Sequence, residues 1–315
     1  MKWQSIVLAT SFVWTSSAAP LVKSEVERRQ SEITDVDVLQ FALTLEHLEN
    51  VYYKAALSNF GLADFIAAGF STEFFQNVQL IAHDEEAHVV FLTQTISAAG
   101  AAPVAACTYN FGNALDSVES FVSLGSVLEG VGVSAYLGGA PVISSKDILS
   151  VAAAVVVSEG IHQGVHRQAL GEASSANIAG TALDPNAIFT LASTFIVSCP
   201  DTNAALPFQA FSQLNAITAQ PNAVNAVQIF SVAESLPETF FVTFVSGLDT
   251  TSVAGTLQGG LIAATVPATA QGPTYAFITS TQANGTIQDS QVLFGPAVLE
   301  ITPGPPTIDN SILKV

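Results

Sequence analysis

The stretch DEEAHV, at residues 84–89, decides the fold and the chemistry of this 315-residue chain. It places Glu85 three residues before His88, and the same spacing recurs between Glu159 and His162. Residues three apart share one face of an α-helix, so each carboxylate and imidazole can bind one metal ion together. Because the chain has only five histidines, two such pairs exceed what chance provides. Two helices are therefore each predicted to supply part of a metal site.

Two further carboxylates stand in apolar surroundings. Glu46 and Glu129 each lie in the middle of a predicted helix, and each is followed seven residues later by a tyrosine, Tyr53 or Tyr136. A buried carboxylate is costly unless it binds a metal ion or accepts hydrogen bonds. We expect both tyrosines to be core aromatics that can hydrogen-bond the ligating carboxylates. The order of these residues predicts a duplicated helix pair.

The complete set matches the pattern of di-metal carboxylate bundles, in which two helices give one Glu each and two give Glu-x-x-His. The six candidate ligands are Glu46, Glu85, His88, Glu129, Glu159 and His162. Oxygen-rich ligation with one imidazole per metal favours two iron or manganese ions, with zinc as an alternative. Four carboxylates would neutralise two divalent ions. No catalytic residue is assigned.

Several neighbouring residues compete with this set. Glu49 is an alternative to Glu46, which is preferred because only Glu46 has the tyrosine seven residues on. Asp84 and Glu86 flank Glu85 but lack its three-residue spacing to a histidine, so we expect them in solvent or beside the ligands. The other histidines are assigned structural or supporting roles: His47, His83 and His166. A metal-free core, in which Glu and His side chains bond one another, is the alternative to the whole site.

Apolar residues recur at helical spacing from Ile33 to about Leu170 and predict four long helices, followed by a short fifth. The first helix begins after Thr34, and the others cover residues 72–98, 115–137, 146–170 and 184–197. After Pro200, short alternating runs of Val, Thr, Phe and Ile predict an antiparallel β-sandwich over residues 201–315. The fold class is therefore mainly α, with a β domain that has no histidine or cysteine and is assigned a structural or surface-binding role.

The N-terminus predicts secretion. An apolar run followed by small residues indicates a signal peptide over residues 1–19, and Arg28-Arg29 would end a propeptide over residues 20–29. An uncleaved, solvated Arg pair is the alternative. In an oxidising compartment we expect Cys107 and Cys199 to form a disulfide. Asn284 begins the sequon Asn-Gly-Thr and is the predicted glycosylation site.

Composition excludes some partners. The formal net charge of -18 repels nucleic acid and anionic lipid and favours cations. A long apolar stretch from Ser120 to Ser145 could suggest a membrane span. Its glycines, its Ala140-Pro141 break and the central Glu129 instead predict a helix buried in protein, so no span is expected in the mature chain.

Several segments resemble the secreted ferritin-like proteins of fungi, which include stress-response and late-sexual-development proteins and are related to plant desiccation-related proteins. The segments are FALTLEHLE at residues 41–49, EEAHV at 85–89, IVSCP at 196–200 and GPAVLE at 295–300. The resemblance implies a ferritin-like four-helix bundle over residues 30–200. It also implies that all six candidate ligands match the metal-binding positions of ferritin-like proteins.

The same resemblance limits the function. The chain has no methionine beyond the first residue to ligate haem, and it lacks the four cysteines of a rubredoxin centre. The added β domain argues against a storage cage. The implied function is an extracellular di-iron or di-manganese protein that handles oxidants or iron during stress or development. The alternative is a non-enzymatic extracellular or cell-wall-associated structural protein with an unmetallated bundle.

Overall fold

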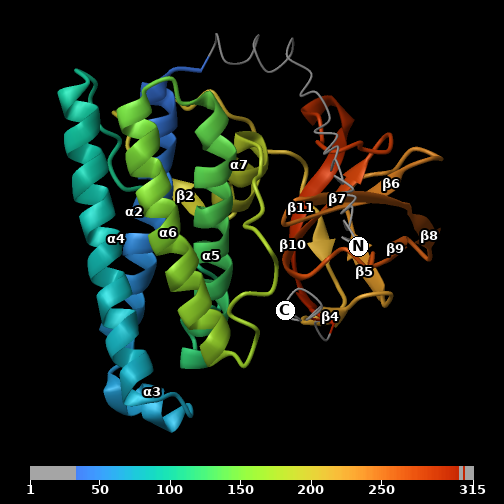
Figure 1. The fold of residues 1–315 in the computed structure, drawn as a ribbon, viewed down its shortest axis with the longest axis horizontal. Coiled ribbons are helices and arrows are strands. Elements are labelled where there is room, and N and C mark those ends of the chain that lie inside the picture. Colours follow the sequence, from blue (N-terminus) through green and yellow to red (C-terminus); the bar gives the residue numbers. More distant parts are fainter. Residues whose placement is uncertain (1–32, 305–307, 309–315) are drawn as a thin grey trace, which may run out of the picture.

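The structure is a computed structural model that describes residues 33–304 and residue 308. A helical bundle lies beside a β domain, with α7 at the junction and the strands β10 and β11 on the side of the β domain that faces the bundle (Figure 1). The helices are α2 (Asp35–Asn59), α3 (Leu62–Ala67), α4 (Thr72–Ala98), α5 (Val118–Gly139), α6 (Lys146–Ala169) and α7 (Pro185–Ser193), with the 3-10 turns η1 (Ala140–Val142) and η2 (Asp289–Gln291). The predicted signal peptide and propeptide lie outside the described residues.

The long helices begin at polar caps that the sequence supplies. Thr34 forms a capping box with Asp37, in which the Asp37 carboxylate accepts a hydrogen bond from the Thr34 backbone N–H at 2.8 Å. A serine accepts a hydrogen bond from a backbone N–H of the first turn in each of the other long helices, at Ser71, Ser117 and Ser145. These caps fix where each helix starts, and α2 packs on α4 as α5 packs on α6.

Two differences from the predicted helices have physical causes. The third long helix begins at Val118 rather than at residue 115, because Ser117 caps it. The fifth helix was predicted to continue to residue 197, but α7 ends at Ser193 and residues Ile196–Ser198 form strand β2. Strand β2 pairs with β1 (Thr108–Tyr109) next to the Cys107–Cys199 disulfide, so tertiary pairing overrides the helical continuation.

The C-terminal domain contains two facing sheets. One has the order β4-β11-β10-β6-β7 and the other β3-β5-β9-β8. The strands are β3 (Asn215–Ala216), β4 (Asn222–Ala223), β5 (Val227–Ser231), β6 (Phe241–Ser246), β7 (Asp249–Ala254), β8 (Thr256–Gln258), β9 (Leu261–Thr265), β10 (Gly272–Thr279) and β11 (Val292–Thr302). Phe230 and Ile262 of the smaller sheet pack with Phe244 and Ile278 of the larger one in a single core. The predicted antiparallel β domain is confirmed, with one parallel pairing between β4 and β11.

The two domains share buried contacts. The Tyr275 hydroxyl of β10 reaches α5, where it lies 3.0 Å from the Gly130 carbonyl oxygen and 2.8 Å from the Ser134 hydroxyl. The Arg167 guanidinium of α6 donates two hydrogen bonds to the Glu300 carboxylate of β11, at 2.5 and 2.9 Å. Arg167 is only 1% exposed, so this ion pair is buried in the domain interface.

Two helical segments within the described residues are long and apolar enough to cross a membrane by composition alone, Val118–Val142 and Lys146–Ala169. The first is mostly buried in the bundle and carries Glu129 at its centre. Such segments also occur as core helices of soluble proteins, so they are weak evidence for a span.

Candidate metal centre

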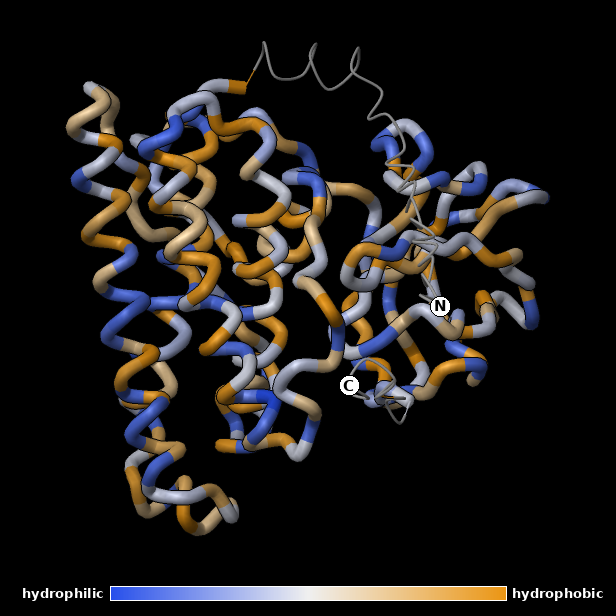
Figure 2. Tube along the Cα trace, in the orientation of Figure 1, coloured by the Kyte–Doolittle hydropathy of each residue, from blue (hydrophilic) through white to orange (hydrophobic). Residues whose placement is uncertain are grey.

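The bundle interior changes from apolar to polar halfway along its helices. Figure 2 shows hydrophilic segments in the middle of α4 between more hydrophobic turns. The structure brings all six predicted ligands together there: Glu46 from α2, Glu85 and His88 from α4, Glu129 from α5, and Glu159 and His162 from α6. All except His88 are buried, and the His88 side chain is 14% exposed.

The six side chains form two overlapping groups. The first group contains Glu46 and His88, and the second contains Glu129 and His162. Glu85 and Glu159 belong to both groups. Within each group, one potential ligand atom per residue lies within 4.8 Å of all the others. This arrangement fits two adjacent cations that share two carboxylates.

The shared carboxylates provide a direct test of that fit. All four carboxylate oxygens of Glu85 and Glu159 are buried and lack a hydrogen-bond partner. The nearest polar atoms are those of the two histidines: His162 Nδ1 lies 2.9 Å from a Glu85 oxygen and His88 Nδ1 lies 3.5 Å from an oxygen of Glu159, which are ion pairs when the rings are protonated but lack hydrogen-bond geometry. Buried oxygens are rarely left unsatisfied in folded proteins, and a cation would satisfy them. The donor set therefore fits two divalent metal ions.

Each half of the duplicated bundle supports the carboxylate of the other half. The Tyr136 hydroxyl on α5 donates to Glu46 on α2 at 2.5 Å. The Tyr53 hydroxyl on α2 donates to Glu129 on α5. Tyr53 also lies 2.8 Å from His166 Nε2, so a proton on that nitrogen can be donated to the Tyr53 oxygen. These bonds leave the other oxygen of each glutamate beside a ligand histidine.

Crowded carboxylates shift one another's protonation. Burial, then the charge of Glu129, raises the pKa of Glu85 to about 7, although the nearby histidines oppose the shift. Burial and the charges of Glu85 and Glu49 raise the pKa of Glu159 well above its usual range. Without a cation, these acids favour the neutral form. Bound cations would restore the charged form that a ligand requires.

The pKa values of the two histidines of the candidate site are also raised, which favours their charged form. Burial lowers the pKa of His88, but Glu46 and Glu85 outweigh it and raise the pKa to about 10. The pKa of His162 is raised to about 11, because the effects of Glu129 and Glu85 likewise outweigh the effect of burial. Burial would raise the pKa of Glu46, yet His88 brings it below the usual value. The metal-free site is therefore held together by protons on its histidines, which a metal must displace.

The competing residues occupy different places. Glu49 is buried but belongs to neither ligand group, and burial with the charges of Glu85 and Glu46 raises its pKa well above the usual range. The half-exposed Asp84 lies 3.4 Å from His162 Nε2. The exposed Glu86 pairs with Lys54 at 3.3 Å.

The three other histidines also differ. His47 lies 3.1 Å from the Val104 carbonyl oxygen, outside the cluster, and His83 is exposed beside Asp84. His166 is fully buried against Tyr53 and thus supports the site through that tyrosine.

Glycines on α5 are functional positions that sequence reasoning missed. A Cβ on Gly132 would lie 2.2 Å from a Glu159 oxygen and 3.2 Å from a Glu49 oxygen. A Cβ on Gly125 would lie 2.6 Å from the His166 ring. The run of glycines in this apolar helix was the available signal, but it shows no partner by itself. Their missing side chains let α6 place its polar groups against α5.

Comparisons with known proteins agree with this geometry. The family model for the ferritin-like domain matches residues 34–172. The helical region is a ferritin-like domain. Protein rds1 of Schizosaccharomyces pombe is 26% identical over 259 residues, which cover 79% of this chain and 60% of that protein. The ferritin-like bundle with a following β domain is thus confirmed.

Two features outside the bundle core concern the predicted modifications. Cys107 and Cys199 form a disulfide that ties the β1 and β2 strands. Asn284 is exposed, next to Gly285 at a positive φ of 86°. Its glycosylation stays a prediction.

Proposed function

We propose that this protein is a secreted di-metal carboxylate protein that binds two iron or manganese ions and reacts with oxygen or peroxide, in oxidant or iron handling. The observation that carries the proposal is the set of four buried oxygens on Glu85 and Glu159, which accept no hydrogen bond and whose polar neighbours are the rings of His88 and His162. They lie between two ligand histidines, and both glutamates belong to both groups. The wider role, in stress or development, rests on the similarity to fungal proteins.

Bound iron or manganese would supply the redox chemistry that the amino acids lack. The chain's own residues prepare the site for it. Tyr53 and Tyr136 orient Glu129 and Glu46, so that each keeps one oxygen facing its histidine. Leu45 and Leu128, which precede these glutamates in the sequence, are buried in the apolar core of the bundle. Without metal, protons on the histidines offset part of the carboxylate charge.

Secretion is supported by the apolar N-terminal sequence and by the disulfide, because disulfides persist in oxidising compartments. Contact with cell-wall components would involve the β domain, whose surface is rich in Thr, Ser and Gln.

The test is elemental analysis of the protein purified from a secreting host without chelator. We expect about two iron or manganese ions per chain. A Glu85→Ala/Glu159→Ala variant should lose them, and Glu86→Ala, which removes an exposed neighbouring acid, should keep them. Peroxide-dependent bleaching of the metal spectrum should vanish in Glu129→Ala.

Two results would contradict the proposal. Less than about a tenth of an ion per chain after attempted reloading would mean that the cluster does not act as a metal site. An unchanged melting temperature in chelator would then support the structural alternative. Bleaching that persists in Glu129→Ala would separate the oxidant chemistry from this site.

A further inference from the structure

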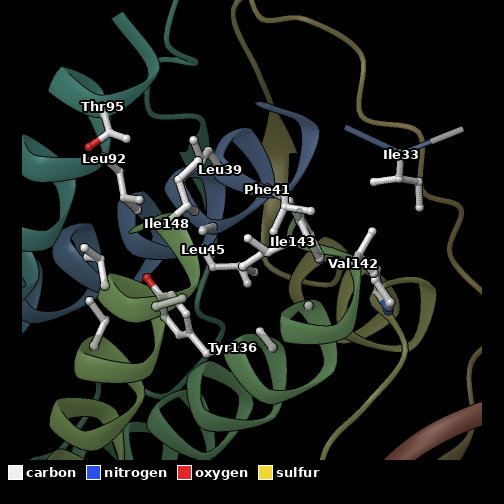
Figure 3. Close-up of a pocket in the computed structure, with 18 of the residues that line it drawn as sticks. Ile33, Leu39, Phe41, Leu45, Leu92, Thr95, Tyr136, Val142, Ile143 and Ile148 are labelled. Atoms are coloured by element: carbon white, nitrogen blue, oxygen red, sulfur yellow. The ribbon is translucent and has the colours of Figure 1, made fainter. Parts of the chain in front are cut away.

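A separate cavity of about 210 Å³ lies between α2, α4, α5 and α6 at one end of the bundle. We call it the Tyr136 pocket, after the residue that links it to the metal centre. Figure 3 shows Tyr136 on one side of the pocket with Leu45 and Ile148, and Ile33 with Val142 on another. Tyr136 donates its hydroxyl proton to the ligand Glu46, so the pocket ends one side chain away from the candidate ligands.

The pocket wall is almost entirely apolar. Among the lining residues only Thr95, Tyr136 and Asp147 have polar side chains. The Thr95 hydroxyl donates to the Phe91 carbonyl oxygen at 2.9 Å, and the Tyr136 hydroxyl is engaged with Glu46. Asp147 is exposed, so it stands at the open edge. The interior therefore offers no free hydrogen-bond donor, and its only side-chain acceptors are these two hydroxyl oxygens, so it disfavours a strongly polar occupant.

The volume of the pocket and the charge around it further restrict the kind of molecule that it can bind. An apolar cavity of roughly 150 Å³ holds benzene, so the larger Tyr136 pocket suits roughly six to ten carbon atoms. The carboxylate of Asp147 and the formal net charge of -18 both disfavour an anionic head group. A hydroxyl at the open edge could instead donate to Asp147.

The other half of the bundle shows that this space is not an inevitable packing defect. Four residues after the ligand His162 stands His166, which packs against Phe121 and Phe74 with ring centroids 5.9 and 5.8 Å apart. Four residues after the ligand His88 stands the smaller Leu92, which lines the Tyr136 pocket. The duplicated helix pair thus fills the space behind Tyr53 and leaves the space beside Tyr136 open.

We propose that the Tyr136 pocket binds an uncharged, hydrocarbon-rich molecule of about six to ten carbon atoms and holds it against Tyr136, beside the metal centre. The pocket as a ligand site needs only the apolar walls. Its position as the organic ligand site of the metal centre rests on the proposed function.

The experiment titrates 1-octanol and octanoate into the full mature chain by calorimetry, with and without metal. We expect 1-octanol to bind both forms and octanoate to bind at least tenfold more weakly. Ala152→Phe places a ring in the pocket and should weaken 1-octanol binding at least tenfold. Ala153→Phe, on the exposed neighbouring position of α6, is the matched control and should bind as the unaltered chain does.

A second variant keeps the test valid if Ala152→Phe fails to fold. Ala135→Leu adds a smaller side chain to the same wall and should weaken binding in the same direction. Unchanged binding in both folded variants, or no 1-octanol binding to a chain that retains its metal, would overturn the pocket. A chain that binds 1-octanol but no metal would instead overturn the proposed function and leave the pocket standing.

Discussion

The two halves of the candidate metal centre contain the same types of side chain but differ in what lies behind each tyrosine. Tyr53 bonds Glu129 on one side and meets His166 on the other, and all three are fully buried. Tyr136 bonds Glu46, but its other side lines an apolar pocket. The half around Tyr53 is filled by the hydrogen-bonded series Glu129, Tyr53 and His166, whereas the half around Tyr136 borders the Tyr136 pocket. Duplicated ligands therefore do not imply duplicated surroundings.

The asymmetry begins in a few residues outside the ligand set. Eight residues before Glu129 stands Phe121, whose ring packs on Tyr53 and His166. Eight residues before Glu46 stands Val38, which lines the Tyr136 pocket. A change of side-chain size at matched positions thus decides whether the half-site is filled.

The largest expected effect is the loss of bound metal when a carboxylate shared by the two groups is removed. Because Glu85 belongs to both ligand groups, Glu85→Ala should reduce metal content from about two ions to nearly none. Glu46→Ala touches one group only and should leave about one ion per chain. Elemental analysis of the purified variants checks this. Equal metal loss in both variants would show that the two groups do not bind independently.

The closed half should be acid-sensitive through His166. Burial lowers the pKa of His166 to about 4, against an ordinary value of 6.5. The unfolded chain takes up this proton below about pH 6.5, whereas the folded chain takes it up only near pH 4. The contribution of the neutral His166 to the free energy of unfolding is therefore complete above pH 6.5 and is lost as the pH falls from 6.5 to 4. The loss amounts to about 3 kcal/mol.

The measurement is urea unfolding of metal-free protein at pH 7 and pH 4.5, beside His166→Leu. The ligand groups titrate in both proteins, so their difference isolates His166. We expect the unaltered chain to lose more stability than the variant as the pH falls. Parallel loss in the two proteins would remove His166 as the cause.

Close helix packing at the shared carboxylate gives the next effect. Gly132→Ala places a Cβ 2.2 Å from a Glu159 oxygen and should destabilise the fold by about 2 kcal/mol while weakening metal binding. Gly160→Ala is the control, because nothing lies within 4 Å of its Cβ and it is exposed. It should be neutral or stabilising by up to about 1 kcal/mol. Thermal unfolding of the two variants measures this difference. Similar melting temperatures for Gly132→Ala and Gly160→Ala would argue against the close contact between residue 132 and Glu159.

The smallest expected effect is the difference in stability between the two tyrosine variants. Tyr53→Phe leaves one oxygen of Glu129 and the Nε2 of His166 without a partner, and it should lower the free energy of unfolding by about 2 kcal/mol. Tyr136→Phe leaves one oxygen of Glu46 and no other group without a partner, and it should lower the free energy of unfolding by about 1 kcal/mol. Denaturant unfolding of the metal-free variants tests the order. If Tyr136→Phe were the more damaging change, the open half would be the more tightly packed one.

The sequence predicted much of this because ligands and caps leave local signals. Spacing alone placed Glu85 with His88 on one helix face, and the bounds Thr72–Ala98 of α4 agree with the predicted helix. The choice of Glu46 over Glu49 followed from the tyrosine repeat, and the structure puts Glu46 in a ligand group. Patterns set by the helix period can be inferred without a structure.

The rest depends on contacts between segments far apart in the chain. Glycine at 132 has no visible role until Glu159 is placed against it. The apolar residues that line the Tyr136 pocket have the same pattern as core residues, because helical periodicity does not show whether a face is filled. The early end of α7 depends on pairing with β1, some 90 residues earlier.

The Arg167–Glu300 pair bears on how modular this protein is. Arg167 stands five residues after the ligand His162, yet its carboxylate partner comes from the last described strand. A chain shortened to the helical region would leave that guanidinium without its Glu300 carboxylate, on the helix that carries two of the ligands. Among the described residues, only the longer ion pair with Glu172, at 3.5 Å, would then remain for this buried charge, so the bundle and the β domain cannot be exchanged as independent units.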